Sequence, residues 1–474
     1  MRFIADLHIH SRYSRATSRD MSLESIWKWA QLKGITVIGT GDFTHPKWFK
    51  ELKEKLEPIG NNLFKLKHIF QNNSIPASCK ADVLFMLTTE ISCIYNKNGR
   101  VRKIHNLVFV PDFSSATKIT TALSKIGNLS ADGRPILGLD AKELLKIILD
   151  ISTEAILVPA HAWTPHFSVF GAESGFDSLE ECFEELTPHI YSIETGLSSD
   201  PLMNWRLSSL DHITLISNSD AHSPAKLGRE ANIFDFSDTS ESTNTHLSKW
   251  DNPPNPPLLK GGEGGLFIKG GEARGIFTKG RKIGIKREIS YESIINALKT
   301  RKGFAGTIEF FPEEGKYHYD GHRFCDVSLS PKETIKHNYL CPVCGKRVTV
   351  GVMHRVEKLA DRADGFRPEG APLYYSIIPL CEIIAETLKV GVNSKAVEAE
   401  YFKVLKNLGN EFRILMDVSI SDIESSGSPV LSEAISRMRS GNVYIEPGFD
   451  GRYGKIKIFE EMERKEIKGQ GMLF

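Results

Sequence analysis

What the sequence lacks excludes several large classes of protein. Only seven cysteines occur among its 474 residues, most of them scattered, so we expect a reducing, cytoplasmic location and no disulfide framework. No apolar run is long enough to span a bilayer, and residues 1–3 lead into the first predicted strand without a signal peptide. The net charge is only +1, so any nucleic-acid surface must be a local patch. A Gly-x-x-x-x-Gly-Lys-Ser/Thr loop is also missing, which leaves NTP-driven motor function unsupported.

The chain opens with a short apolar strand that ends in two histidines. His8 and His10 are two residues apart, so on a strand their side chains point to the same face. Both can then enter one cavity and bind a divalent metal ion. Taken alone, the pair would more often be two exposed histidines near a chain end, and the rest of the pattern decides against that alternative.

Asp, Glu or His recurs beside one predicted strand after another through residues 1–237. Alternating strands and helices predict an α/β domain with a mostly parallel sheet, whose strand ends face one side, where active sites collect. A cavity lined by such side chains suits two or three divalent ions, for which phosphoester hydrolysis is the natural chemistry. The predicted strands are residues 35–39, 83–88, 106–110, 156–160, 190–193 and 215–219, and the polar residues beside them include Asp42, Glu90, His105, His161, Glu194, Asp220 and His222.

This pattern resembles the signature of the PHP (polymerase and histidinol phosphatase) superfamily. The resemblance implies a distorted seven-stranded β/α barrel that holds up to three metal ions, commonly zinc or manganese. In the common form a His directly follows the Asp of the second motif, whereas here Phe43 follows Asp42 and the next His is His45. Either Asp42 or His45 is therefore the ligand, and we favour Asp42. The predicted ligands are His8, His10, Asp42, Glu90, His105, His161, Asp220 and His222.

A second metal site is predicted after the barrel. Cys341-Pro-x-Cys344-Gly is a zinc knuckle, in which two thiolates on a tight turn bind one ion. His322 and Cys325 have the matching spacing for the other two ligands, with His318 and His354 as competitors for the His position.

The chain divides into four predicted parts. Residues 1–312 form the barrel, with a low-complexity insertion at 251–284 that we expect to be a flexible, solvated loop. An amphipathic helix over residues 291–298 completes the barrel. Residues 313–352 form the zinc-binding module, 353–460 a mainly helical C-terminal domain, and 461–474 a charged tail.

The whole chain outside the insertion is similar to the endonuclease Q family of DNA repair nucleases. The stretches that carry this similarity are residues 39–46, 159–165, 194–201, 217–224 and 341–345, with 354–357 following. It implies cleavage of the phosphodiester 5′ to a deaminated base (uracil, hypoxanthine or xanthine) or an abasic site. It also implies about three Zn²⁺ ions in the barrel and one structural Zn²⁺, with Mn²⁺ or Mg²⁺ as alternatives in the barrel. Asp220, His222 and Glu90 would be the catalytic residues.

Two other classes of protein would need less than this sequence contains. A phosphatase of small esters would need no zinc knuckle or helical extension, and a non-catalytic nucleic-acid-binding protein would not need the full ligand set. A deaminated base would have to be flipped into a pocket. Trp163, His166, Phe167 and Phe170 are candidates for its lining, with ordinary loop packing as the alternative.

The last residues contain a possible partner motif. Gln470-x-Met472-Leu473-Phe474 is similar to the bacterial peptide that binds the replication sliding clamp, although Gly471 stands where Leu is usual. The alternative is an arbitrary apolar chain end.

Overall fold

The computed structural model describes residues 1–71, 74–237, 288–426 and 429–460. The predicted insertion at 251–284 and the predicted clamp motif at 470–474 lie outside this part of the chain. Within the described residues, no helix is both long and apolar enough to cross a membrane.

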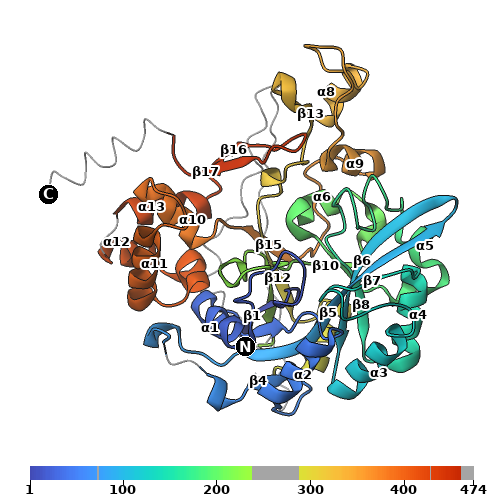
Figure 1. The fold of residues 1–474 in the computed structure, drawn as a ribbon. Helices are drawn as coiled ribbons and strands as arrows, with labels where there is room; N and C mark the ends of the chain where they lie inside the picture. Colours follow the sequence, from blue (N-terminus) through green and yellow to red (C-terminus); the bar gives the residue numbers. More distant parts are fainter. Residues whose placement is uncertain (72–73, 238–287, 427–428, 461–474) are drawn as a thin grey trace, which may run out of the picture.

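The fold is a mixed α/β architecture built on one central sheet (Figure 1). Its central path runs β15-β12-β11-β1-β2-β5-β4-β3, with β6 pairing β5 and β8, and β7 pairing β5. The eleven strands are β1 (Arg2–Asp6), β2 (Val37–Gly39), β3 (Leu56–Pro58), β4 (Phe64–Leu66), β5 (Leu84–Lys97), β6 (Arg100–Val110), β7 (Ile136–Leu137), β8 (Ile156–Pro159), β11 (Ala231–Asp235), β12 (Phe304–Glu309) and β15 (Leu373–Ser376).

Three smaller sheets of two strands each complete the described strands. They are β9 (Ser192–Glu194) with β10 (Thr214–Ile216), β13 (Asp320–His322) with β14 (Val327–Leu329), and β16 (Tyr444–Glu446) with β17 (Lys455–Lys457). Because β9 and β10 pair only with each other in the described part of the chain, barrel closure and the predicted count of seven strands are not confirmed.

The prediction of a mostly parallel sheet was wrong, because six of the ten strand pairings in the central sheet are antiparallel, including the long β5–β6 hairpin. Its turn contains Asn98 and Gly99, both at positive φ (55° and 70°), the conformation that tight hairpin turns require. The hairpin places Ser92 opposite His105, so His105 lies inside β6 and reaches the site from an antiparallel strand.

Thirteen α-helices occur within the described residues. The predicted amphipathic helix is present as α7, which begins with a capping box at Ser290. The helices are α1 (Leu23–Lys33), α2 (Pro46–Lys55), α3 (Phe113–Leu123), α4 (Ala141–Ile151), α5 (Leu179–Phe183), α6 (Pro201–Asn204), α7 (Tyr291–Thr300), α8 (Pro331–Lys336), α9 (Val352–Leu359), α10 (Leu380–Leu388), α11 (Lys395–Leu408), α12 (Ile420–Ser425) and α13 (Pro429–Arg439).

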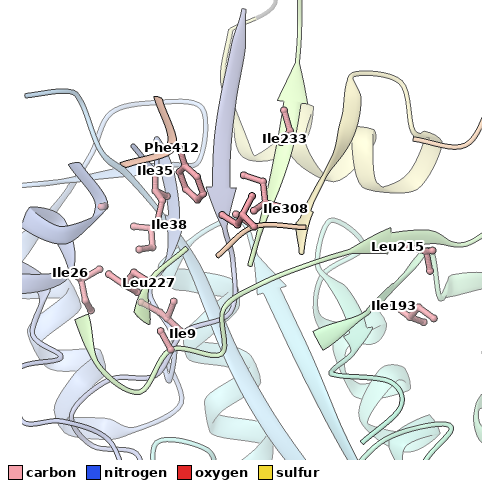
Figure 2. Close-up of a cluster of buried hydrophobic side chains, with 14 of the residues drawn as sticks. Ile9, Ile26, Ile35, Ile38, Ile193, Leu215, Leu227, Ile233, Ile308 and Phe412 are labelled. Carbon is pink, nitrogen blue, oxygen red and sulfur yellow. The ribbon is translucent and has the colours of Figure 1, made fainter. Parts of the chain in front are cut away.

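The C-terminal helices share a hydrophobic core with the first elements of the chain. Figure 2 shows Phe412 beside Ile35 in a cluster that also contains Ile9 and Ile308. Gly34, which ends α1 at φ 93°, leaves room for the close approach of Asn410, since a Cβ atom there would lie 2.3 Å from its side-chain oxygen. Figure 1 accordingly places α10–α13 next to α1, whereas β13 and α8 project away from the sheet.

A buried ion pair also joins these two parts. Lys33, at the end of α1, lies 2.7 Å from Glu411, and both side chains are buried. Glu411 also accepts hydrogen bonds from the Tyr401 hydroxyl (2.8 Å) and the Leu380 backbone N–H (3.1 Å). The carboxylate therefore has a partner on α1 and two on the C-terminal helices.

Candidate active site

His8 and His10 follow β1, and each ring is fixed by a carboxylate behind it. Nδ1 of His8 lies 3.0 Å from Glu194, and Nδ1 of His10 lies 3.0 Å from Asp42. A proton on Nδ1 that is donated to a carboxylate leaves the lone pair on Nε2 for a metal ion. The Nε2 atoms of both rings face Glu90 and Asp220, which places two imidazoles and two carboxylates around one point.

Glu90 lies between two such groups of side chains. Its Oε2 atom lies 3.1 Å from Nε2 of His10, within the group made by His8, His10, Glu90 and Asp220. Its Oε1 atom lies 2.7 Å from Nδ1 of His105 and 3.2 Å from Nε2 of His161, which complete a second group. In each group the donor atoms lie within 4.8 Å of one another. One carboxylate therefore contributes a different oxygen to each of two candidate metal positions.

Unpaired polar atoms support a bound cation at this point. Nε2 of His8, Nε2 of His10 and Oδ1 of Asp220 are buried without a hydrogen-bond partner among the described residues. Burial alone disfavours a charged imidazole, but the carboxylates of Glu194, Asp220 and Glu90 outweigh it and hold the pKa of His8 well above its usual value. The cavity therefore carries surplus negative charge, which a metal cofactor would balance.

Three of the predicted ligands have a strained backbone. Asp42, His161 and Asp220 have φ values of 49°, 30° and 46°, in the left-handed region that residues with a side chain rarely adopt. Such strain clusters at functional sites, where the surrounding structure holds it in place. For Asp220 the hydrogen bond from the His10 backbone N–H to the Ala221 carbonyl (3.0 Å) fixes the adjacent segment.

Two predicted ligands lie beside these groups rather than within them. Asp42 contacts His10 on the Nδ1 side and accepts further hydrogen bonds from Ser11 and Ser14, so its position is that of a residue that orients His10. His222 donates from Nδ1 to the Asp220 carbonyl (2.9 Å), and its ring centroid lies 4.6 Å from that of His10. The competitor of Asp42, His45, instead stacks on Tyr13.

The predicted zinc-binding module brings its four predicted ligands together. Donor atoms of His322, Cys325, Cys341 and Cys344 lie within 4.8 Å of one another, a set that suits tetrahedral zinc. The competitor His354 is engaged elsewhere, with Nδ1 2.8 Å from Asp320. The other competitor, His318, is buried and belongs to no such group.

Comparison with known proteins extends over the whole chain. A family model of the MJ0043 C-terminal domain matches residues 379–442. The uncharacterised protein MJ0043 of Methanocaldococcus jannaschii is 30% identical over 300 residues, 63% of this chain, but the chain spans only 31% of that relative's length. The uncharacterised protein YqxK of Bacillus subtilis is 27% identical over 465 residues, 96% of this chain and 98% of the relative.

Two solved structures are similar from end to end. The crystal structure of the lesion-specific endonuclease PfuEndoQ from Pyrococcus furiosus has a TM-score of 0.76 and 29% identity, covering 100% of both chains. A structure of endonuclease Q with a 27-mer duplex that carries an abasic lesion at the active site has a TM-score of 0.74 and 30% identity, covering 98% of both chains. The chain belongs to the endonuclease Q family.

The four candidate pocket residues of this endonuclease Q family member separate into two pairs. Trp163 and Phe170 are buried against each other, and the indole N–H of Trp163 donates to Asn204 (2.8 Å), which favours loop packing for this pair. His166 is exposed, and Phe167 is half-buried with its ring centroid 4.7 Å from that of His105. Only the second pair retains surface that a base can contact.

Sequence reasoning missed two residues of the site. Glu194 follows the pattern of polar residues beside strands, but it was not included among the functional residues; it binds His8, the His161 backbone N–H (2.8 Å) and Asn218 (2.9 Å). Arg134 lies 3.1 Å from Glu90 and comes from a loop with no periodic pattern or motif. The only signal for Glu194 was its place after a predicted strand, and none pointed to Arg134.

Cys344→Ser is expected to remove one zinc ion per chain and to destabilise the zinc-binding module, because a structural zinc contributes folding free energy directly. Metal analysis together with thermal unfolding measures both effects. The control is Cys381→Ser, since Cys381 lies outside the four-ligand group on α10. Unchanged zinc content in the Cys344 variant would contradict the assignment.

Proposed function

We propose that the protein is a metal-dependent DNA endonuclease that cleaves the phosphodiester 5′ to a deaminated base or an abasic site. The observation that carries the proposal is Glu90, which contributes one oxygen to each of two adjacent groups of metal-binding side chains. It is supported by the end-to-end similarity to a lesion-specific endonuclease and to a family structure with abasic DNA at its active site. This DNA would be the partner of the present chain as well.

Metal ions belong to the proposal because the donor set suits them. His8, His10, Glu90 and Asp220 would hold one ion, and Glu90, His105 and His161 another. About three Zn²⁺ ions remain our expectation for this site, with Mn²⁺ or Mg²⁺ as alternatives. Bound there, divalent ions would lower the pKa of a water molecule and would stabilise the charge on the phosphate during cleavage.

The protein's own side chains set the geometry for this chemistry. Glu194 and Asp42 orient the rings of His8 and His10 through their Nδ1 atoms. His222 lies beside the first group and is 30% exposed, which supports a role in contacting the substrate. His166 and Phe167, near the second group, are our candidates for contact with a flipped base.

Three finer features accompany this proposal and stay predictions. They are closure of the central sheet into a distorted seven-stranded barrel, the division of the chain into four parts, and binding of residues 470–474 to a sliding clamp. The first follows from the resemblance to the PHP superfamily, and the last concerns residues outside the described part of the chain.

The test is incision of a labelled duplex that carries a single uracil, hypoxanthine or abasic site. We expect cleavage on the 5′ side of the lesion, leaving a 3′-hydroxyl and a 5′-phosphate, and loss of cleavage after chelation that added metal ions restore. An undamaged duplex of the same sequence and a small phosphate ester are the controls. Hydrolysis of the ester without incision would favour a phosphatase, and DNA binding without any hydrolysis would favour a non-catalytic protein.

A further inference from the structure

A permanent positive charge reaches the metal-binding groups at Arg134. Nη1 of this side chain lies 3.1 Å from Oε2 of Glu90. A guanidinium carries five N–H donors in a planar fork and stays charged at any physiological pH. The Arg134 side chain is 26% exposed, so the contact with Glu90 leaves part of this fork open to solvent.

The loop that carries Arg134 is fitted closely against the site. A Cβ atom on the preceding residue, Gly133, would lie 2.3 Å from both Oδ2 of Asp42 and Oγ of Ser14, so only glycine allows the loop to approach this far. The Gly133 backbone N–H donates to the Tyr13 carbonyl (3.0 Å). The backbone at Gly133 therefore contacts Tyr13, in the segment that follows His10, and also lies against the Asp42 carboxylate that orients the His10 ring.

Further hydrogen bonds fix this loop at both ends. Oδ1 of Asp132 accepts from the backbone N–H groups of Arg134 (3.2 Å) and Arg15 (3.1 Å). After Arg134, the Pro135 carbonyl accepts from the backbone N–H of Ser92 on β5, two residues beyond Glu90 (3.0 Å). A side chain on so constrained a backbone has few positions available, which pre-organises the guanidinium beside Glu90.

We propose that Arg134 binds a non-bridging oxygen of the scissile phosphate. This role rests on the proposed function. Guanidinium–phosphate contacts are strong and directional, and a fixed cation beside the reacting phosphate stabilises the charge that develops on it in the transition state. Glu90 accepts a hydrogen bond from one N–H group of the guanidinium, and the phosphate accepts from the N–H groups that remain. The same arginine thus links a predicted metal ligand to the substrate.

The experiment compares full-length Arg134→Ala and Arg134→Lys with wild type on abasic DNA. For Arg134→Ala we expect kcat to fall about 100-fold or more with KM changed far less, because the contact strengthens in the transition state. Arg134→Lys should stay well below wild type, since an ammonium cannot replace the planar fork. Added guanidinium ion should restore part of the Arg134→Ala activity, and metal content should match wild type. The control is Arg100→Ala, an exposed arginine at the turn of the β5–β6 hairpin.

Several outcomes would overturn this role. The first is that Arg134→Ala turns over abasic DNA as fast as wild type. The second is that Arg134→Ala loses both activity and bound metal, and that added guanidinium ion does not restore the activity. The second outcome would mean that Arg134 serves only as the charge partner of Glu90. If wild type cleaves abasic DNA and Arg134→Ala does so equally well, this inference fails and the proposed function stands. A wild-type protein that leaves abasic DNA intact would overturn the proposed function and this role with it.

Discussion

Asp220→Asn is expected to lower the rate of incision at least about 1,000-fold. Oδ1 of Asp220 lies 3.1 Å from Nε2 of His10 and 3.5 Å from Nε2 of His8, and it has no hydrogen-bond partner in the described residues. An amide has the same shape but is a much poorer ligand for a divalent ion, so the change removes one donor and one negative charge from the first group. The surface that contacts DNA outside the cavity is unaltered, and binding to abasic DNA should persist.

Incision and binding are measured separately on the same abasic duplex, by product analysis and by fluorescence anisotropy. The matched control is Asp150→Asn, which removes an exposed carboxylate at the end of α4 and should leave both quantities unchanged. Turnover of the Asp220 variant near the wild-type rate would remove Asp220 from the site.

Glu411→Gln is expected to lower the free energy of unfolding by about 3 kcal/mol or more, because it leaves the Lys33 ammonium buried without a charged partner. The lost interaction joins α1 to the C-terminal helices. Denaturation in urea measures the effect. Replacing both residues together, Lys33→Met with Glu411→Gln, should cost less than the single change, because no unpaired charge stays buried and the Gln oxygen can still accept a hydrogen bond from Tyr401 or Leu380.

The matched control for this pair is Glu400→Gln on α11. Glu400 and Lys403 form a pair three residues apart on one helix, 3.1 Å from each other, and the lysine is about half exposed. Such a pair contributes only about 0.5 kcal/mol or less. Equal losses for the two single changes would show that Lys33 and Glu411 do not couple the two regions.

Local patterns in the sequence predicted several of the side chains that the structure brings together, because most of them lie on or beside strands. His8 and His10 are two residues apart directly after β1, and the paired thiols of Cys341 and Cys344 have a spacing that few other structures require. The Asn98-Gly99 dipeptide is also a local signal, because it is typical of the turn of an antiparallel hairpin. The prediction of a mostly parallel sheet did not take this signal into account.

Other features have no local pattern to predict them. Lys33 and Glu411 are ordinary charged residues in sequence, and only the tertiary fold makes them a buried pair. Arg134 lies in an irregular loop, where periodicity gives no information. The spacing of the motifs in the sequence does not give the distance between Asp42 and His10. It therefore could not predict that Asp42 contacts Nδ1 of the His10 ring.

The place of β15 in the central sheet has a consequence for synthesis on the ribosome. This strand pairs in parallel with β12, yet the whole predicted zinc-binding module lies between the two in the chain. All four candidate ligands of the module leave the ribosome before β15, while the sheet behind it still lacks an edge strand. At translation rates of about 5–20 residues per second, that edge stays open for seconds, and an unpaired strand edge is a site for mispairing with other chains. A nascent chain stalled before β15 should therefore be the form that most depends on a chaperone.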